Sequence, residues 1–210
     1  MLTLLDRFIQ ERKFILAILR LTILLFFLTS CFKSENDTKK KSIDLTSIKI
    51  RAQELKTDGQ GKSNLEAVLK TIHGNIVFKF FPNDAPNTVT RFIELIQSGF
   101  YDGLSFHRVV PNFVIQGGDP TGTGTSGSGK KLIAEFNSRK HLLGSIAMAR
   151  AKDIDSADSQ FYIALKELPQ LDGKYTIFAQ VIKGFEVLPQ IVKGDKMIFI
   201  TLKGSDNLFK

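Results

Sequence analysis

Tryptophan is absent from this chain of 210 residues, cysteine occurs once and tyrosine three times. A single cysteine excludes an internal disulfide framework and any metal site built from several thiolates. No uninterrupted apolar run reaches the roughly 20 residues that span a bilayer, since Arg20 divides the stretch that comes nearest to it. Apolar residues make up 43% and charged residues 24% of the chain, which excludes a disordered, collagen-like or multi-pass membrane protein.

The positive charge is spread along the chain. The formal net charge is +8, yet residues 63–210 carry 17 basic and 14 acidic groups and are nearly balanced. A nucleic-acid-binding protein concentrates its positive charge on one element or face. We therefore expect no nucleic-acid partner.

The N-terminal segment has the pattern of an export signal. A basic stretch ending at Arg20 precedes eight apolar-rich residues, 21–28, and Cys31 follows after two further residues. Eight residues fit the core of a secretory signal and are too few to span a bilayer. Residues 28–31, LTSC, resemble the lipobox of bacterial lipoproteins, in which the cysteine becomes the first residue and carries lipid such as palmitate. An ordinary signal peptide and an uncleaved anchor are the alternatives.

We expect a signal peptide over 1–30, a lipid-anchored polar tether over 31–62, a folded domain over 63–204 and a short tail over 205–210. The tether is rich in Lys, Ser, Asp and Gly and has no sustained apolar period. Anchored through Cys31, the protein would lie in a bacterial cell envelope, on the periplasmic or outer surface.

The region after the tether contains many short apolar runs. Residues 65–72 and 76–81 flank His73-Gly74-Asn75, which is a hairpin signal. Further runs, broken by Gly, Pro and Asp, predict strands at 104–110, 113–116, 143–149, 160–164, 175–182 and 197–202. Many short strands with few helices favour an antiparallel barrel or sandwich.

Two segments show the spacing of an amphipathic helix. The first has Val89, Phe92, Ile93 and Ile96 on one face, with a proline at its start and a glycine at its end. The second covers 185–192, and its Pro189 is compatible with a helix only in the first turn.

The glycine-rich stretch 117–129 imitates two phosphate-binding patterns. Residues 122–127 match G-x-G-x-x-G and residues 124–130 nearly match a P-loop, but Lys131 stands where Mg²⁺ binding needs Ser or Thr. A phosphate site also needs a helix N-terminus directly after the glycines. We interpret the stretch as a flexible surface loop. The three histidines lie 34 residues apart, without a second ligand nearby, and predict no zinc site.

One stretch departs from an ordinary β-domain sequence, and four others follow or precede it in a fixed order. Residues 106–120 read FHRVVPNFVIQGGDP. The others read PNTVTRF at 86–92, AMAR at 147–150, DSQFYI at 158–163 and LDGKYTIF at 171–178. This order and spacing resemble the cyclophilins, the peptidyl-prolyl cis-trans isomerases, and in particular their bacterial branch. The resemblance covers essentially all of 63–204.

The resemblance implies a mainly β fold: a closed, eight-stranded antiparallel barrel capped by two α-helices. It implies isomerisation of Xaa-Pro bonds in proline-containing polypeptides, by a monomer without cofactor or metal. In exported proteins, this would assist folding. A binding module that holds proline segments without turnover, and a surface lipoprotein that acts in adhesion, are the alternatives.

The resemblance also implies roles for particular residues. Three are catalytic, with Arg108 as the donor to the twisted amide: Arg108, Gln116 and Phe113. The resemblance places Val114, Tyr162 and Leu171 in the lining of the proline pocket. It places Ala149 and the backbone of Arg150 against the residue before proline. It places Met148, Gln160 and Tyr175 at the rim.

Four positions differ from the common eukaryotic pattern. Val114 replaces Met, Tyr162 replaces Phe and Tyr175 replaces His, and each keeps an apolar or hydrogen-bonding body. Gln170 stands where many relatives carry Trp. Because the indole is a large contact and a donor for cyclosporin, the resemblance implies weak cyclosporin binding here.

Overall fold

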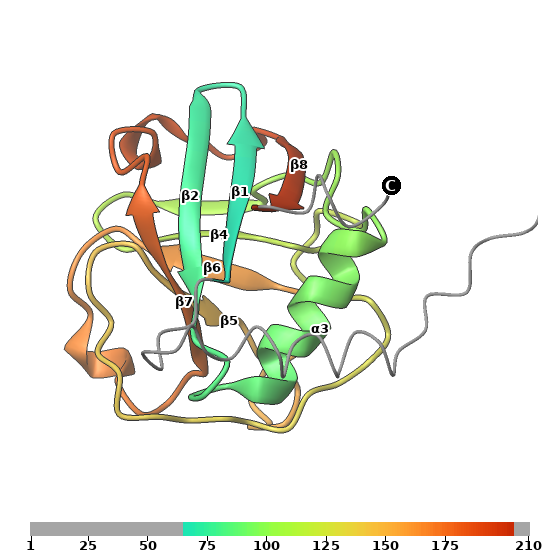
Figure 1. Ribbon diagram of the computed structural model, residues 1–210, viewed down its shortest axis with the longest axis vertical. Coiled ribbons are helices and arrows are strands. Elements are labelled where there is room, and N and C mark those ends of the chain that lie inside the picture. Colours follow the sequence, from blue (N-terminus) through green and yellow to red (C-terminus); the bar gives the residue numbers. More distant parts are fainter. Residues whose placement is uncertain (1–64, 204–210) are drawn as a thin grey trace, which may run out of the picture. The chain divides into compact units, whose positions relative to one another are not determined.

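The computed structural model describes residues 65–203, which form a mainly β domain (Figure 1). Each apolar run that predicts a strand overlaps one: β1 Glu66–Thr71, β2 Gly74–Phe80, β3 Arg108–Val110, β4 Val114–Gly117, β5 Ser145–Met148, β6 Phe161–Ala164, β7 Ile177–Lys183 and β8 Met197–Leu202. The helical elements of this part of the chain are the α-helix α3, Pro86–Gln97, and the 3₁₀ turns η1, Pro169–Leu171, and η2, Leu188–Gln190.

The strands form one antiparallel sheet in the order β3-β4-β6-β5-β7-β2-β1-β8. The expectation of a closed barrel is not confirmed, because the edge strands β3 and β8 do not pair along their length. The strand expected over 104–110 forms only at its last three residues. One isolated bridge, Ser105 to Lys196, joins the two ends of the curled sheet instead.

The hairpin signal at residue 73 is confirmed. Strands β1 and β2 lie side by side in Figure 1, with Thr71 paired to Gly74 across a two-residue turn. Gly74 has φ 138°, which a residue with a Cβ adopts only under strain.

Of the two α-helices expected, the described residues contain one. Helix α3 buries Val89, Phe92, Ile93 and Ile96 as its spacing predicts. In the second segment only the turn η2 forms, and its hydrogen bonds run to the third residue back, as from Gln190 N–H to the Val187 carbonyl at 3.0 Å. The reason is Pro189, which lacks the N–H that an α-helix needs there.

The N-terminus of α3 is capped from a distant part of the chain. Its N-cap position, Ala85, has no side chain that can accept a hydrogen bond. The Glu135 carboxylate accepts the backbone N–H groups of Asn87 at 2.9 Å and Thr88 at 2.8 Å instead. A carboxylate at this end satisfies free N–H groups and favours the helix dipole.

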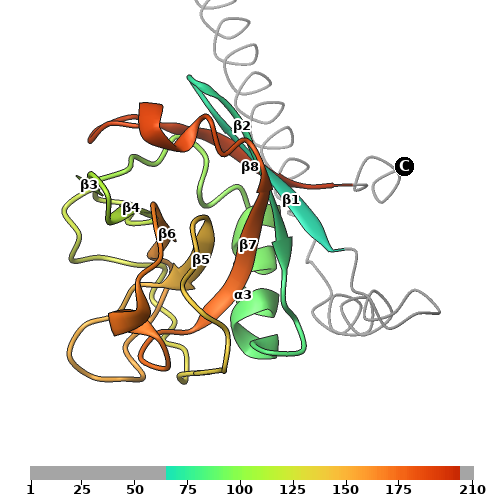
Figure 2. The same ribbon diagram turned by 90° about the vertical axis from the view of Figure 1, so that its left-hand side faces the viewer.

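The main core lies between the sheet and α3, which stand next to each other in Figure 2. Phe92 on α3 lies 6.0 Å from Phe80, 5.2 Å from Phe161 and 4.7 Å from Phe178, measured between ring centroids. These tilted and edge-to-face contacts join the helix to β2, β6 and β7. Six phenylalanines are buried in this core: Phe78, Phe80, Phe92, Phe106, Phe161 and Phe178.

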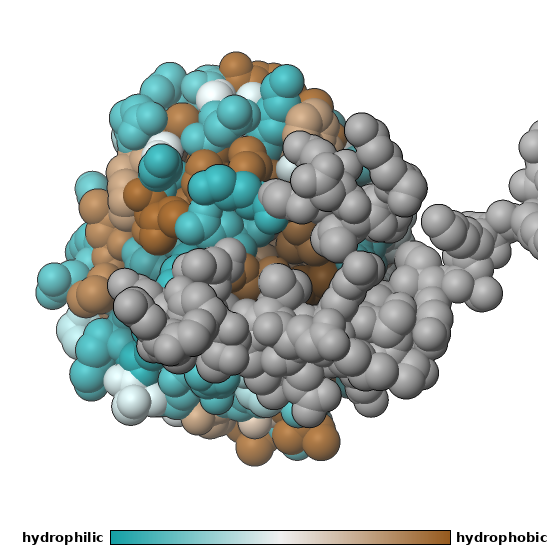
Figure 3. Space-filling model, in the orientation of Figure 1, coloured by the Kyte–Doolittle hydropathy of each residue, from teal (hydrophilic) through white to brown (hydrophobic). Residues whose placement is uncertain are grey.

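Some apolar side chains also reach the surface. On the face drawn in Figure 3, hydrophobic and hydrophilic residues are interspersed outside the grey atoms. No helix within 65–203 has the length and hydropathy needed to cross a membrane. The signal, tether and tail predicted for 1–30, 31–62 and 205–210, with Cys31, lie outside the described residues.

Candidate active site

A tight turn between β3 and β4 sets the position of Arg108. Pro111 and Asn112 are the central residues of this turn, which is closed by a 3.0 Å hydrogen bond from the Phe113 N–H to the Val110 carbonyl. Asn112 has φ 56°, and a positive φ at this position, after proline, is typical of a type II turn. The turn fixes the register in which Arg108 lies directly opposite Gln116.

This register extends across four strands. Arg108 on β3 pairs with Gln116 on β4, Gln116 with Tyr162 on β6, and Tyr162 with Ala147 on β5. Directly paired residues share one face of a sheet. The topology therefore places the candidate donor, its polar neighbour and an aromatic floor in one row.

A chain of hydrogen bonds orients the polar end of that row. Arg108 Nη1 lies 3.4 Å from Gln116 Oε1, Gln116 Nε2 donates to Gln160 Oε1 at 3.0 Å, and Gln160 Nε2 donates to the Ser126 carbonyl at 2.8 Å. The Gln116 carbonyl oxygen is thereby turned toward the guanidinium. Arg108 is exposed and forms no ion pair within residues 65–203, so its donors are available to a substrate.

An apolar cluster lies beside this chain, separate from the main core. Four residues predicted to line the proline pocket belong to it or pack against it: Val114, Tyr162, Phe113 and Leu171. Val114 and Tyr162 are buried, whereas Phe113 and Leu171 are partly exposed. The Arg108 guanidinium carbon lies 5.6 Å from the Phe113 ring centroid, so the charged donor stands next to the apolar surface.

The structure corrects the prediction for Met148. Its side chain is 3% exposed and packs in the main core, so it does not close the rim. Successive side chains of a strand point to opposite faces. Because Ala147 belongs to the site cluster, Met148 turns to the core, and Ala149 packs against the site cluster again.

Arg150 and Tyr175 contact each other at this cluster. The Arg150 guanidinium lies 4.9 Å from the Tyr175 ring centroid, within cation–π range. Arg150 also donates to the Lys174 carbonyl at 3.2 Å and 3.1 Å. Tyr175 meets Tyr162 edge to face at 5.7 Å, which links the Arg150 side chain to the aromatic floor.

The glycine-rich loop is built around a buried carboxylate that the sequence did not single out. Asp119 is 1% exposed and accepts the backbone N–H groups of Thr121, Gly124 and Ser126 at 2.7, 2.6 and 3.1 Å. Burial alone would raise the pKa of Asp119, but hydrogen bonds from Thr121, Ser126 and Gly124 outweigh it and lower the pKa to about 2. No helix follows the glycines between residues 130 and 144, so the phosphate patterns lack the context they need.

The histidines have separate partners. His73 Nε2 lies 2.7 Å from Asp195, and His141 contacts both Asp172 and Tyr162. His107 is buried beside Arg108, and burial lowers its pKa. Across residues 65–203, no three His, Cys, Asp or Glu side chains come together as a metal site would need.

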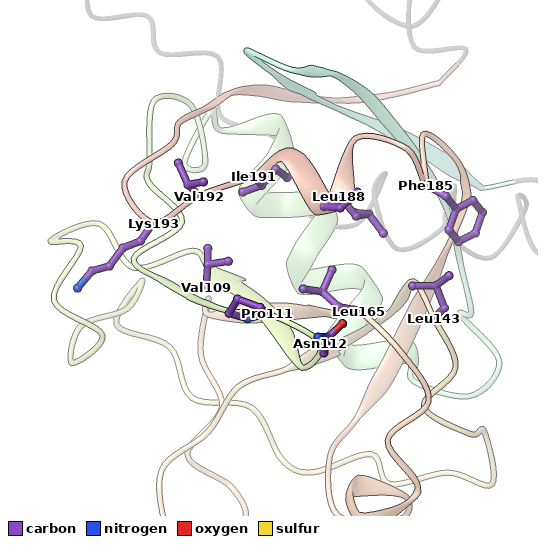
Figure 4. Close-up of a pocket in the computed structure, with 11 residues that line it drawn as sticks. Val109, Pro111, Asn112, Leu143, Leu165, Phe185, Leu188, Ile191, Val192 and Lys193 are labelled. Carbon is purple, nitrogen blue, oxygen red and sulfur yellow. The ribbon is translucent and has the colours of Figure 1, made fainter.

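A cavity of about 570 Å³ lies beyond the β3–β4 turn, below η2 in Figure 4. Its walls are mostly apolar, and its polar lining side chains are Asn112 and Lys193. Val109 and Pro111 line it, whereas Arg108 and Gln116 do not. The cavity is therefore distinct from the row of predicted site residues.

Comparison with known proteins agrees with this arrangement. Residues 67–202 match the family model described as cyclophilin type peptidyl-prolyl cis-trans isomerase/CLD. A peptidyl-prolyl cis-trans isomerase of Synechococcus elongatus is 45% identical over 139 residues, covering 65% of this chain and 95% of that protein. Peptidyl-prolyl cis-trans isomerase B of Bacillus subtilis is 44% identical over 131 residues, covering 61% of this chain and 91% of that protein.

A solved structure of similar fold is the cyclophilin type isomerase of Cryptosporidium parvum, determined in the presence of the dipeptide Ala-Pro. It has a TM-score of 0.63 and 31% sequence identity, covering 66% of this chain and 99% of that one. The family match extends over more than half of the chain and includes the strands and helix described above, apart from Glu66 at the start of β1. The chain belongs to the family of cyclophilin-type peptidyl-prolyl cis-trans isomerases.

Proposed function

We propose that this isomerase acts on Xaa-Pro bonds of exported proteins and that Arg108 is its catalytic donor. The observation that carries the proposal is the row in which Arg108, Gln116 and Tyr162 lie opposite one another on adjacent strands. It combines a fixed cation, an amide that holds it and an apolar surface large enough for a proline ring.

The chemistry requires no covalent step. Rotation about an Xaa-Pro bond is opposed by about 18–20 kcal/mol, because it breaks the resonance of the amide. Uncatalysed isomerisation takes tens of seconds or more. Reaching milliseconds requires about 10⁴-fold acceleration, or about 5.5 kcal/mol.

In the twisted amide the proline nitrogen regains its lone pair, which can accept a hydrogen bond. The guanidinium of Arg108 carries a positive charge and presents N–H groups in a rigid fork. A donor fixed in this way favours the twisted state over either planar state, and that difference lowers the barrier. Gln116 holds the guanidinium through its Oε1 atom, while its own Nε2 atom is held by Gln160.

The apolar cluster supplies the binding surface. We assign the proline ring to the surface formed by Phe113, Val114, Tyr162 and Leu171. Ala149 and the backbone of Arg150 would contact the preceding residue, with Gln160 and Tyr175 at the rim. Burying the ring here orients the peptide bond over Arg108 and removes water from the amide.

The export signal and Cys31 in the sequence support the cellular part of the proposal. A lipid-anchored isomerase on the extracytoplasmic side would meet polypeptides as they emerge unfolded, when their Xaa-Pro bonds populate both isomers. The client proteins would be recognised through exposed Xaa-Pro segments.

The test measures turnover and client refolding with the purified protein. We expect it to accelerate cis-trans exchange of an Ala-Pro tetrapeptide, followed by NMR exchange spectroscopy, at catalytic concentration. We also expect it to accelerate a proline-limited refolding phase of an exported protein. Peptide binding without faster exchange would contradict the catalytic assignment and identify a binding module instead.

A further inference from the structure

A buried histidine connects the floor of the proposed proline pocket to its rim. The Nε2 atom of His141 lies 2.9 Å from the Tyr162 hydroxyl, and the two rings are stacked with centroids 6.0 Å apart and planes 11° from parallel. His141 is 1% exposed and Tyr162 is 4% exposed. The hydroxyl therefore finds its hydrogen-bond partner inside the protein.

The other side of the ring is bound to the rim loop, residues 168–172, which carries Leu171. His141 Nδ1 lies 3.0 Å from Asp172 Oδ1, and the His141 backbone N–H donates to the same oxygen at 2.8 Å. The Leu168 N–H in turn donates to the His141 carbonyl at 2.9 Å. Three hydrogen bonds thus tie the loop to this one residue.

The charges around the ring determine where its proton lies. Hydrogen bonding by the His141 N–H lowers the pKa of Asp172, against the opposing effect of desolvation. Lys140, 3.4 Å from Asp172 Oδ2, adds to this effect. An ionised carboxylate only accepts hydrogen bonds, so Nδ1 carries the hydrogen. In a neutral imidazole with this tautomer, Nε2 is the acceptor and the Tyr162 O–H is the donor.

Tyr162 makes such an acceptor necessary. A phenylalanine at this position would need no partner, whereas a buried phenol that lacks one is costly. If the hydroxyl hydrogen turned toward the proline ring, it would place an unpaired donor against an apolar substrate. Held by His141, the phenol presents only its apolar ring to that surface.

We propose that His141 is a positioning residue of the proline pocket, accepting the Tyr162 hydroxyl through Nε2 and holding the rim loop through Nδ1–H and Asp172. The inference rests on the proposed function for the identity of the substrate group. The hydrogen-bond arrangement itself does not depend on it.

The first test reads the tautomer directly. In ¹⁵N-labelled full-length protein at neutral pH, a long-range ¹H–¹⁵N spectrum should show His141 with Nδ1 protonated and Nε2 unprotonated. In Tyr162→Phe, the Nε2 resonance should move because it loses its donor, while the Nδ1 resonance stays near its original position. A protonated Nε2 atom, or an Nε2 resonance unaffected by Tyr162→Phe, would overturn the proposal. This readout requires no isomerase activity.

The second test is a double-mutant cycle on kcat/KM for an Ala-Pro peptide. Tyr162→Phe supplies the reference background, and in the wild-type background we expect His141→Leu to lower kcat/KM about tenfold, equivalent to about 1.4 kcal/mol. In the Tyr162→Phe background, His141→Leu should cost much less, because no phenol remains to be satisfied. An equal loss in both backgrounds would assign His141 a purely structural role and overturn the proposal.

His73→Leu is the matched control, because it also breaks a His–Asp contact, the partly buried contact to Asp195, which lies outside the site cluster. Its kcat/KM should equal that of the wild type. A wild-type protein without turnover would refute the proposed function, whereas the tautomer result would stand or fall independently.

Discussion

Replacing Asp119 should lower both the stability and the activity of the protein, and the two effects can be measured separately. Its carboxylate holds the glycine-rich loop through Thr121, Gly124 and Ser126. In Asp119→Asn, the amide NH₂ group would face N–H donors where an oxygen now accepts them. The substitution therefore leaves at least one buried donor without a partner.

The expected loss of stability follows from the pKa. Lowering the Asp119 pKa from 3.8 to about 2 corresponds to about 2 kcal/mol, at about 1.4 kcal/mol for each tenfold change in proton affinity. Because the folded-state pKa is depressed, this stability is fully present above pH 4. It is lost progressively as the pH falls toward 2.

Urea unfolding at pH 7 should show Asp119→Asn less stable than the wild type by about 2 kcal/mol. The difference should shrink as the pH is lowered from 4 to 3. Asp102→Asn, at an exposed carboxylate, should differ by less than about 0.5 kcal/mol. Equal stability at pH 7, or a difference independent of pH, would refute the reasoning.

The same substitution should also reduce activity. The Ser126 carbonyl accepts a hydrogen bond from Gln160 Nε2, and Gln160 in turn holds Gln116 beside Arg108. Loosening the loop therefore releases the far end of the hydrogen-bond chain. We expect kcat/KM to fall about threefold to tenfold at pH 7 in the absence of urea, where the variant remains folded.

Three further predictions concern inhibition, anchoring and metal dependence. Cyclosporin should bind weakly. Gln170→Trp on the exposed turn η1 should tighten cyclosporin binding at least thirtyfold and leave turnover within threefold of the wild type. Unchanged affinity would contradict the role assigned to this position. Cys31→Ser should move the protein out of the membrane fraction, whereas persistent detergent-phase partitioning would point to an uncleaved anchor. EDTA should leave kcat/KM unchanged, and loss of activity on chelation would show a metal requirement.

Much of the fold could be predicted because its strands are short, apolar and separated by glycine, proline or aspartate. The helix α3 was predictable from its apolar spacing, since Val89, Phe92, Ile93 and Ile96 lie on its buried face. The closure of the barrel and the second helix were expected from the family resemblance and from a helical spacing. Neither pattern reports whether two edges pair, and Pro189 left the second segment a single 3₁₀ turn.

The site was predictable where a residue type identifies the chemistry, as for Arg108 and Gln116. Met148 was assigned to the rim by the family resemblance, whereas strand alternation sends its side chain to the core. His141 contacts Tyr162 and Asp172, which lie 21 and 31 positions away in the sequence. Asp119 accepts hydrogen bonds from the backbone of its own loop, as from the Gly124 N–H. No local sequence pattern marks such contacts.

Arg108→Ala tests the central claim most directly. We expect kcat/KM to fall about 10²-fold or more, equivalent to losing one preorganised donor worth about 2.7 kcal/mol. The unfolding midpoint should stay unchanged because the side chain is exposed. Lys203→Ala, which removes a cation paired with Glu66 on β1, should retain wild-type turnover. Wild-type kcat/KM in Arg108→Ala would contradict the account.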